Sequence, residues 1–276
     1  MSKQISFNKF DVSNDLPFFL ISGPCQLESR DHAMFMADEI KKITDKLKIN
    51  LVFKTSFDKA NRTSIKSQRG LGLDKSIKVF EEIKKNLELP ILTDVHTSEQ
   101  CNQVKDVVDI IQIPAFLCRQ TDLLISAAKT NLVINVKKGQ FLAPWDMKNV
   151  VKKISDSNND KILITERGVS FGYNTLISDM RSISVLKKEQ CPVIFDATHS
   201  VQQPGGKGDA SSGEREYIYD LSKAAIAVGV AGLFLEVHDN PDNAPSHGPN
   251  MLKLSDLERF LINVKKIDDL IKENNL

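Results

Sequence analysis

The sequence predicts an α/β protein, a (β/α)8 TIM barrel preceded by a short N-terminal β-hairpin. Two observations lead to this prediction. Short apolar runs rich in Val, Ile and Phe recur eight times along the 276 residues, and stretches with helical spacing of apolar residues separate most of them. Runs this short are typical of strands buried on both faces, and intervening helices require parallel strands joined by right-handed crossovers.

The eight runs are spaced roughly 20 to 40 residues apart, which matches a barrel better than an open doubly wound sheet. They cover residues 18–22, 51–54, 90–95, 109–113, 132–136, 161–165, 192–196 and 232–236. Amphipathic stretches at 32–47, 76–87 and 123–130 follow the first, second and fourth runs. His32 opens the first of these stretches, and we expect it to be solvated.

The chain ahead of the first run reads QISF and KFDV around an Asn8-Lys9 pair, which predicts a hairpin within residues 1–16 that plugs one barrel end. No linker or shift in composition divides the chain, so residues 1–276 are expected to form a single domain. The longest segment without a predicted element, 200–216, contains four glycines and follows the seventh strand. We expect it to act as a mobile lid.

Composition limits the partners. The 37 Lys and Arg nearly balance 36 Asp and Glu, which argues against nucleic acid as a partner. No apolar stretch approaches the roughly 20 residues that span a bilayer, and the N-terminus lacks a signal-peptide pattern, so we expect no membrane partner and a cytoplasmic location. The four cysteines form no C-x-x-C pair and are expected to be reduced.

Polar residues follow every predicted strand, at the barrel end where active sites of this fold lie. A single one is explained by capping of the next helix, but eight in register indicate a site. They are Cys25; Lys54 and Ser56 with Lys59, Asn61 and Arg62; Asp94 with His96; Gln112 with Arg119; Lys137 and Lys138; Glu166 and Arg167; Asp196 and His199; Glu236 and His238.

The cations in this set indicate a multiply anionic substrate, because a nearly neutral protein concentrates positive charge where anions bind. A mixture of Arg and Lys suits phosphorylated metabolites. The cations are Lys54, Lys59, Arg62, Lys137, Lys138 and Arg167.

Cys25, His199 and Glu236 follow the first, seventh and eighth strands, which become neighbours when the barrel closes. A thiolate, an imidazole and a carboxylate can bind Zn, Fe, Mn or Co. The alternative is that they are a buried thiol, a hydrogen-bonded histidine and a helix-capping carboxylate.

Five segments in order, at 53–64, 110–124, 133–150, 165–174 and 195–206, resemble the 3-deoxy-D-manno-octulosonate 8-phosphate synthases, with likeness from about residue 17 to the C-terminus. The resemblance implies condensation of phosphoenolpyruvate with D-arabinose 5-phosphate, releasing phosphate, in lipopolysaccharide inner-core sugar biosynthesis. It also implies a homo-oligomer, typically a tetramer.

The resemblance assigns roles to residues of this chain. Lys137 and Arg167 would hold the phosphate of phosphoenolpyruvate, Lys59 and Ser56 its carboxylate region, and Lys54 and Lys138 would add charge nearby. Asn61 would bind a sugar hydroxyl and Arg62 the sugar phosphate, which Arg119 would reach from a neighbouring subunit. We add Gln112 to the substrate-binding set and take Lys59, Asn61, Asp94 and His199 as catalytic. The general base stays open between Asp94 and a metal-bound water.

Members of this family with Cys in the GPC segment depend on a divalent metal, and Cys25 places this chain with them by resemblance. Their fourth ligand is an Asp in the segment equivalent to 243–250, where this chain has His247. We expect His247 to replace that Asp. The alternatives are a shifted alignment in which Asp239 or Asp242 binds the metal, and a metal that is weak or dispensable.

Two other functions remain open from the sequence. One is the related heptulosonate 7-phosphate synthase, which uses erythrose 4-phosphate but carries Lys-Pro-Arg-Thr where this chain reads KANR. The other is a barrel that binds sugar phosphates without catalysis, which the altered fourth ligand would motivate.

Overall fold

The computed structural model describes residues 3–7, 9–205 and 212–274. Within them, eight parallel strands close into a barrel in chain order, because the last strand pairs with both the first and the seventh. No strand end lies more than two residues from its predicted position, so the predicted barrel is confirmed. The strands are β3 (Phe19–Gly23), β4 (Leu51–Lys54), β5 (Ile91–Asp94), β6 (Ile110–Ile113), β7 (Val133–Lys137), β8 (Ile162–Glu166), β11 (Val193–Asp196) and β14 (Gly232–His238).

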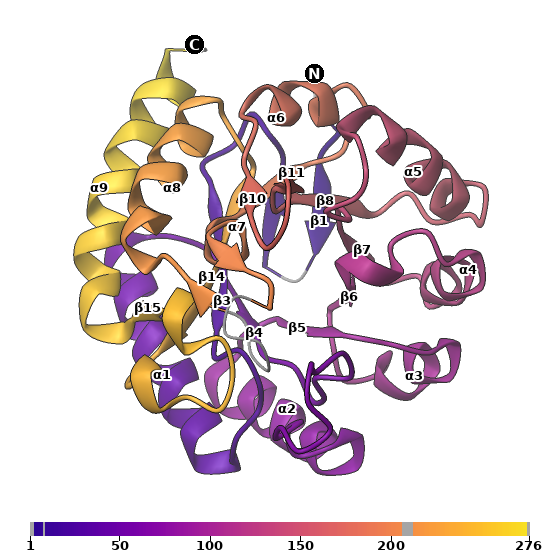
Figure 1. Cartoon of the computed structure of the whole chain (residues 1–276), viewed down its shortest axis with the longest axis vertical. Helices are drawn as coiled ribbons and strands as arrows, with labels where there is room; N and C mark the ends of the chain where they lie inside the picture. The colour runs from indigo at the N-terminus through magenta and orange to yellow at the C-terminus, as the bar shows by residue number, and fades with distance from the viewer. Residues whose placement is uncertain (1–2, 8, 206–211, 275–276) are drawn as a thin grey trace.

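Helices surround the barrel (Figure 1). The first shows why they form where they do: the Ser29 side chain caps it by accepting from the His32 N–H, and its buried residues recur on one face. The helices are α1 (Arg30–Leu47), α2 (Leu73–Leu87), α3 (Ser98–Val104), α4 (Thr121–Lys129), α5 (Met147–Ser155), α6 (Arg181–Lys187), α7 (Ala197–Ser200), α8 (Ile218–Ala227) and α9 (Leu254–Glu273).

Shorter elements shape the loops. Antiparallel pairs form between β9 (Val169–Ser170) and β10 (Leu176–Ile177), and between β12 (Gln202–Gln203) and β13 (Ser212–Gly213). β15 (Leu252–Lys253) pairs in parallel with the end of β14. The 3-10 helices are η1 (Ala115–Leu117), η2 (Pro144–Asp146), η3 (Arg215–Tyr217), η4 (Pro241–Asn243) and η5 (Gly248–Asn250). Part of the predicted lid, 206–211, lies outside the described residues.

The barrel interior has an apolar layer and a polar layer, built by the same strands. Side chains of a strand alternate between faces, so residues two apart point the same way. Val52, Leu92, Ile110 and Ile194 pack together in the apolar layer. Two residues later in each strand come Lys54, Asp94, Gln112 and Asp196, all of which line a cavity. The inward face of these four strands thus changes from apolar to charged or polar toward the C-terminal end.

The predicted N-terminal hairpin is confirmed. β1 (Ile5–Phe7) pairs with β2 (Phe10–Val12) in antiparallel register. Ile5 and Val12 are buried in the same cluster as the apolar barrel layer, so the hairpin covers the barrel end opposite the polar layer. A second, larger apolar cluster lies between the barrel and its helices.

A close approach between β3 and β4 positions Cys25. A Cβ atom on Gly23 would lie 2.0 Å from the carbonyl oxygen of Lys54, so only glycine permits this contact. Beyond it, Gln26 and Ser56 form an isolated parallel bridge. These contacts hold the segment that carries Cys25 against the residues that follow β4. In the part of the chain that the structure describes, no helix has the length and apolar character needed to cross a membrane.

Candidate active site

A cavity of about 1070 Å³ opens at the C-terminal ends of the barrel strands. The residues around it run from Lys54, at the end of β4, to Pro249, in the loop after β14. Because these residues were predicted separately from each strand end, their convergence confirms a single rim. The predicted site residues that line the cavity are Lys54, Lys59, Asn61, Arg62, Asp94, Gln112, Lys137, Arg167, His199 and His247.

Five other predicted residues do not line the cavity. Cys25, Ser56 and Glu236 are buried, and each contacts a lining residue. Lys138 is also buried, where its ammonium lies 3.3 Å from Glu166 Oε1 and from the carbonyl oxygen of Leu142. Arg119 is exposed on the loop after β6, although Phe116 and Leu117 of that loop reach the cavity wall.

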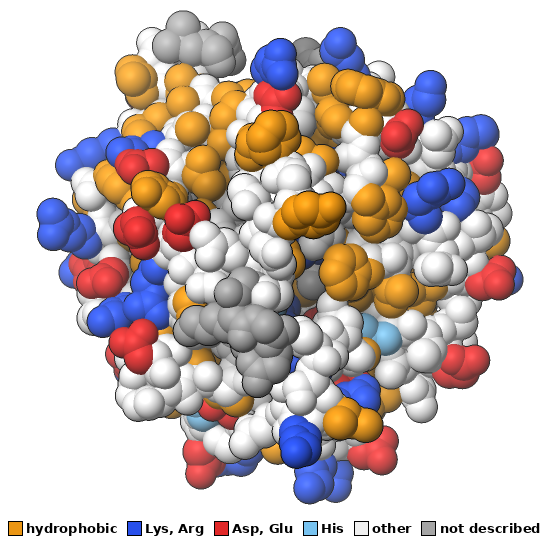
Figure 2. All heavy atoms as spheres, viewed as in Figure 1, with side chains coloured by type: hydrophobic (Ala, Val, Ile, Leu, Met, Phe, Trp, Pro, Cys, Tyr) orange, Lys and Arg blue, Asp and Glu red, His pale blue; other side chains and the backbone are white. Residues whose placement is uncertain are grey.

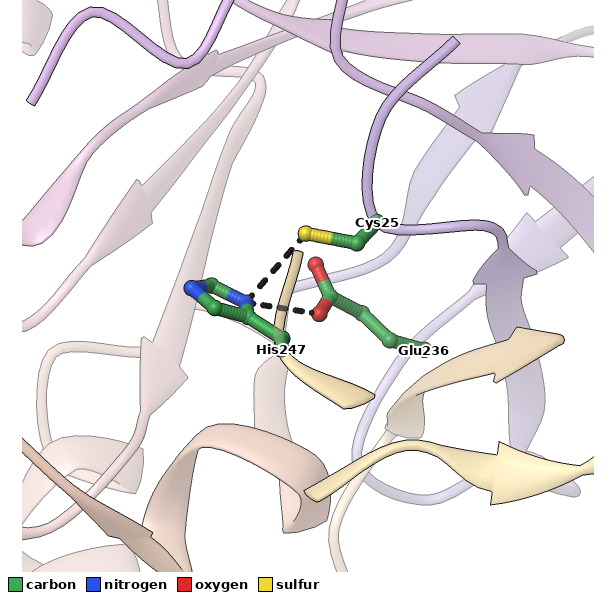
Figure 3. A group of neighbouring side chains, drawn as sticks. All are labelled: Cys25, Glu236 and His247. Atoms are coloured by element: carbon green, nitrogen blue, oxygen red, sulfur yellow. Dashed lines mark hydrogen bonds and ion pairs between the residues drawn. The ribbon is translucent and has the colours of Figure 1, made fainter. Parts of the chain in front are cut away.

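Cys25, Glu236 and His247 form a group of potential metal ligands, with one donor atom from each within 4.8 Å of the others (Figure 3). Nδ1 of His247 lies 3.3 Å from Cys25 Sγ and 3.0 Å from Glu236 Oε2. Nε2 of His199 lies 3.5 Å from the other Glu236 oxygen, Oε1. Three of the four predicted ligands therefore form one group, and the fourth, His199, lies beside that group through its approach to Glu236.

The two alternative ligands lie elsewhere in the described structure. Asp239 Oδ1 contacts His32 Nε2 at 3.0 Å, and Asp242 Oδ1 accepts from Arg215 at 3.0 Å. His247 is therefore the residue of the 239–247 segment that joins Cys25 and Glu236. Its backbone is left-handed, with φ 55°, a conformation in which Asn, Asp and His are enriched among non-glycine residues.

Cys25, Glu236 and His247 form a charged group in which protons occupy the place that a metal ion could take. Burial and Glu236 act to raise the pKa of the Cys25 thiol, but His247 and Lys59 outweigh them and hold it below its usual value. Burial alone would lower the pKa of His247, but negative charge on Cys25 and Glu236 raises it to about 9. A thiolate and a carboxylate are thus balanced by protons on neighbouring groups. Such a donor set fits a divalent transition metal, whose charge would substitute for those protons.

His199 is prepared as a neutral ligand. Its Nδ1 lies 2.7 Å from Asp196 Oδ2, which leaves the Nε2 lone pair facing Glu236. Burial outweighs the nearby carboxylates and lowers the pKa of His199 to about 4, so the imidazole is uncharged at neutral pH. A carboxylate behind a histidine is the arrangement that orients imidazole ligands in metal sites.

Asp196 also holds Lys137. The two form a buried ion pair, and the Lys137 ammonium lies 3.2 Å from the ring centre of Phe234. Burial lowers the pKa of Lys137 to about 8; Asp196 opposes this shift, and the charges of Lys54 and Arg167 add to it. Lys137 therefore sits among like charges without full compensation, which favours a bound anion.

Arg167 and Arg62 offer further positive charge to the cavity. Arg167 donates to Gln202 Oε1 at 3.0 Å, while its buried Nε has no hydrogen-bond partner among the described residues. Arg62 donates to Ser246 Oγ at 2.7 Å and Gln26 Oε1 at 2.8 Å. Its remaining described hydrogen bonds go to backbone carbonyls, so neutral oxygens hold the guanidinium.

Asp94 organises the wall after β5. Ser56 Oγ donates to one of its oxygens, and His96 Nε2 lies 3.0 Å from the other. Burial would raise the pKa of Asp94, but His96, Lys54 and Lys59 hold it well below its usual range. Asp94 is therefore ionised at neutral pH and is a weak proton acceptor in this state.

The sequence places Asp196 and His96 at strand ends but assigns neither a role. Strand alternation supports the position of Asp196, because it lies two residues after inward-facing Ile194. The contact of His96 with Asp94 depends on the turn after β5, which the sequence does not predict. The prediction that His32 is solvated was wrong: its side chain is 16% exposed and contacts Asp239. The β14–α1 contact that buries it joins distant parts of the chain.

Comparison with known proteins decides the family. A model described as the DAHP synthetase I family matches residues 3–273. The chain belongs to the DAHP synthetase I family. Within it, the chain is 59% identical over 271 residues to the 2-dehydro-3-deoxyphosphooctonate aldolase of Brucella anthropi, covering 98% of both chains. It is 58% identical over 273 residues to the enzyme of that name from Rickettsia canadensis, covering 99% of this chain and 100% of the relative.

A relative from Bartonella quintana with the same name is 60% identical over 263 residues, 95% of each chain. The aligned lengths show that this member of the DAHP synthetase I family matches these relatives over the whole barrel, including the cavity rim. The sequence resemblance to the octulosonate 8-phosphate synthases is therefore confirmed at the level of the family.

Proposed function

We propose that this chain condenses phosphoenolpyruvate with D-arabinose 5-phosphate and water to give 3-deoxy-D-manno-octulosonate 8-phosphate and phosphate, a step in lipopolysaccharide inner-core sugar biosynthesis. The observation that carries this proposal is the 58 to 60% identity over nearly the full length with 2-dehydro-3-deoxyphosphooctonate aldolases. The cavity supports it, because its walls carry the cations that two phosphorylated substrates require. The chain is an enzyme of the transferase type that forms a C–C bond.

Phosphoenolpyruvate would bind deep in the barrel. Lys137 and Arg167 are assigned to its phosphate, and the unpartnered Nε of Arg167 supports this assignment because a buried donor needs an acceptor. Lys59, with Ser56 behind the wall, is assigned to the carboxylate region, and Lys54 adds charge. Lys138 remains a weaker assignment, since Glu166 already pairs with it away from the cavity.

D-Arabinose 5-phosphate would bind above it, with Asn61 at a hydroxyl, Arg62 at the phosphate and Gln112 on the facing wall. Arg62 supports this role because only neutral oxygens hold its charge in the described structure, so a phosphate would be its first anionic partner. Held this way, two anions that repel each other in water are brought into one orientation by fixed positive charges, which is a large source of rate acceleration.

Cys25, His199, Glu236 and His247 would hold a divalent metal ion, one of Zn, Fe, Mn or Co. A thiolate, two imidazoles and a carboxylate suit such an ion. His199 is already neutral, and because its Nδ1 contacts Asp196, its Nε2 is the nitrogen that would bind the ion. When bound, the ion would supply Lewis-acid polarisation of a substrate oxygen. Asp94 stays ionised, accepts from Ser56 behind the cavity wall and contacts His96, which lines the cavity.

We propose that the chain works as a homotetramer in the cytoplasm. Arg119 does not line its own cavity, which supports its assignment to the sugar phosphate of a neighbouring subunit. Apolar side chains also gather on the face around the cavity mouth (Figure 2). The loops after β6, β7 and β8 expose Phe116, Phe141, Trp145, Phe171 and Tyr173. Large exposed apolar patches are typical of interfaces between chains.

Phosphate release tests the function. The purified chain is mixed with phosphoenolpyruvate and either D-arabinose 5-phosphate or D-erythrose 4-phosphate, each with and without a metal chelator. We expect release with the arabinose substrate, loss of release with chelator and recovery on adding a divalent metal. Preference for erythrose 4-phosphate would favour the heptulosonate synthase instead. Binding of both substrates without release would favour the non-catalytic barrel.

A further inference from the structure

A second group of metal-type ligands lies outside the cavity, where the start of α1 meets the end of β14. It consists of Glu28, His32 and His238, with one donor atom from each within 4.8 Å of the others. None of the three lines the cavity. They come from segments more than 200 residues apart, so the barrel closure between β3 and β14 brings them together.

The two histidines share the Asp239 carboxylate, and Glu28 contacts one of them. His238 Nε2 lies 2.9 Å from Glu28 Oε1. Oδ1 of Asp239 lies 3.0 Å from His32 Nε2 and 3.1 Å from His238 Nδ1, which also accepts from the backbone N–H of Asn240. The two imidazole rings are 4.7 Å apart between centroids.

His32 provides a separate observation that points to a ligand. Its Nδ1 is buried and has no hydrogen-bond partner among the described residues. Because Nε2 faces the Asp239 carboxylate, a neutral His32 carries its proton there and leaves a lone pair on Nδ1. A buried acceptor without a donor is costly unless another group fills the role.

We propose that Glu28, His32 and His238 form a second binding site for a divalent transition-metal ion of the zinc class, with Asp239 beside them as a further carboxylate. Ligands around tetrahedral zinc lie about 3.4 Å apart at normal bond lengths, so a small closure of the 4.8 Å group suffices. Two imidazoles with carboxylates suit zinc, nickel or cobalt, whereas calcium and magnesium take oxygen ligands.

An ion in this site would tie α1 to the strand that leads into the active-site loop. β14 carries Glu236 two residues before His238, and the chain continues from Asp239 to His247. An ion that binds the folded chain and not the unfolded one raises its stability by mass action. The site would therefore stabilise the contact between α1 and β14, where the barrel closes, and would take no part in catalysis.

Zinc stoichiometry tests the proposal on the full-length protein. Four proteins are dialysed against Zn²⁺ with a weak competing chelator that keeps loose surface sites empty: the natural chain, Cys25→Ser, His32→Gln, and the double variant. We expect Cys25→Ser to retain one ion per chain that the double variant loses. His96→Gln is the matched control, since His96 belongs to neither group, and it should bind as many ions as the natural chain.

Two further readouts separate loss of the site from loss of the fold. Zinc should raise the melting temperature of Cys25→Ser and leave that of the double variant unchanged, while their metal-free melting temperatures agree. With Co²⁺, Cys25→Ser should give a spectrum without a thiolate band, and the double variant none. Equal zinc content in Cys25→Ser and the double variant would overturn the second site.

Discussion

Asp196 accepts from Nδ1 of His199 at 2.7 Å and pairs with the Lys137 ammonium through the same oxygen, Oδ2. One carboxylate therefore orients a proposed metal ligand and a proposed phosphate-binding cation. The Phe234 ring also lies against both side chains, but it carries no charge, so Asp196 couples the two halves of the site electrostatically.

Asp196→Asn should impair both halves while keeping the size of the side chain. The amide has no negative charge, and its NH₂ group cannot accept a hydrogen bond from His199 or Lys137 as the carboxylate oxygen does. Losing a partner behind a metal-binding histidine typically costs 10- to 100-fold in metal affinity or activity. Metal titration and the KM for phosphoenolpyruvate measure the two effects. A variant with normal metal affinity and normal KM would contradict the coupling.

Two replacements of His247 should show whether metal binding needs a donor atom at this position or needs histidine itself. His247→Asp keeps a donor and tolerates the left-handed backbone, so it should still bind metal and release phosphate. His247→Ala removes the donor, and we expect metal affinity to fall by more than about 100-fold, the upper end of what the loss of an indirect partner costs. Metal content after dialysis and rates with added metal are compared. Unchanged occupancy and rate in His247→Ala would exclude it as a ligand.

The pH dependence of phosphoenolpyruvate capture should report Lys137. Its pKa is lowered to about 8, so the ammonium is charged below that pH and loses its proton above it. Because the charged form attracts the phosphate, kcat/KM for phosphoenolpyruvate should fall as the pH rises through about 8. Lys137→Arg keeps the charge at all accessible pH values, so that fall should disappear from its profile. The same alkaline fall in both proteins would assign it to another group.

Arg62→Lys should weaken binding of the sugar phosphate selectively. Lysine keeps one positive charge but cannot reproduce the planar fork that contacts phosphate. We expect the KM for D-arabinose 5-phosphate to rise about tenfold or more, with little change in the KM for phosphoenolpyruvate. Initial rates with each substrate varied in turn distinguish the two. An equal rise in both would show that Arg62 shapes the whole mouth through Ser246 and Gln26.

Lys138→Met should lower stability, because it leaves the buried Glu166 without its cation. Removing one partner of a buried pair typically costs about 3 to 5 kcal/mol in the free energy of unfolding. The double variant Lys138→Met/Glu166→Gln is the matched control and should recover much of that loss. Urea unfolding measures it. A raised KM with unchanged stability would instead support direct contact between Lys138 and substrate.

Most of the fold followed from the sequence because its signal is local. Each barrel strand is a short apolar run, and the residue that closes its inward face is charged or polar, as in Val52 with Lys54 and Ile194 with Asp196. A turn signal at Asn8-Lys9 and flanking apolar residues were enough to predict the hairpin. The approach of Cys25, His199 and Glu236 also follows once the barrel closes, whereas His247 was predicted only from the family resemblance.

The contacts between distant loops could not be predicted. Arg62 donates to Ser246 and Gln26 across the mouth of the cavity, and His32 contacts Asp239 where α1 meets the end of β14. Neither pairing leaves a periodic trace, because loop geometry decides it after the barrel has formed. For the same reason the sequence did not predict the pairing of Lys138 with Glu166. From the sequence alone, Lys138 counts as one more cation at the rim of the barrel.

The left-handed backbone at position 247 restricts which residues can replace His247 without strain. Glycine fits there without cost, and Asn, Asp and His are the side chains that accept this geometry most readily. All three carry an oxygen or nitrogen donor. Glycine offers no donor, but among residues that have a side chain the loop favours replacements that can still hold an ion.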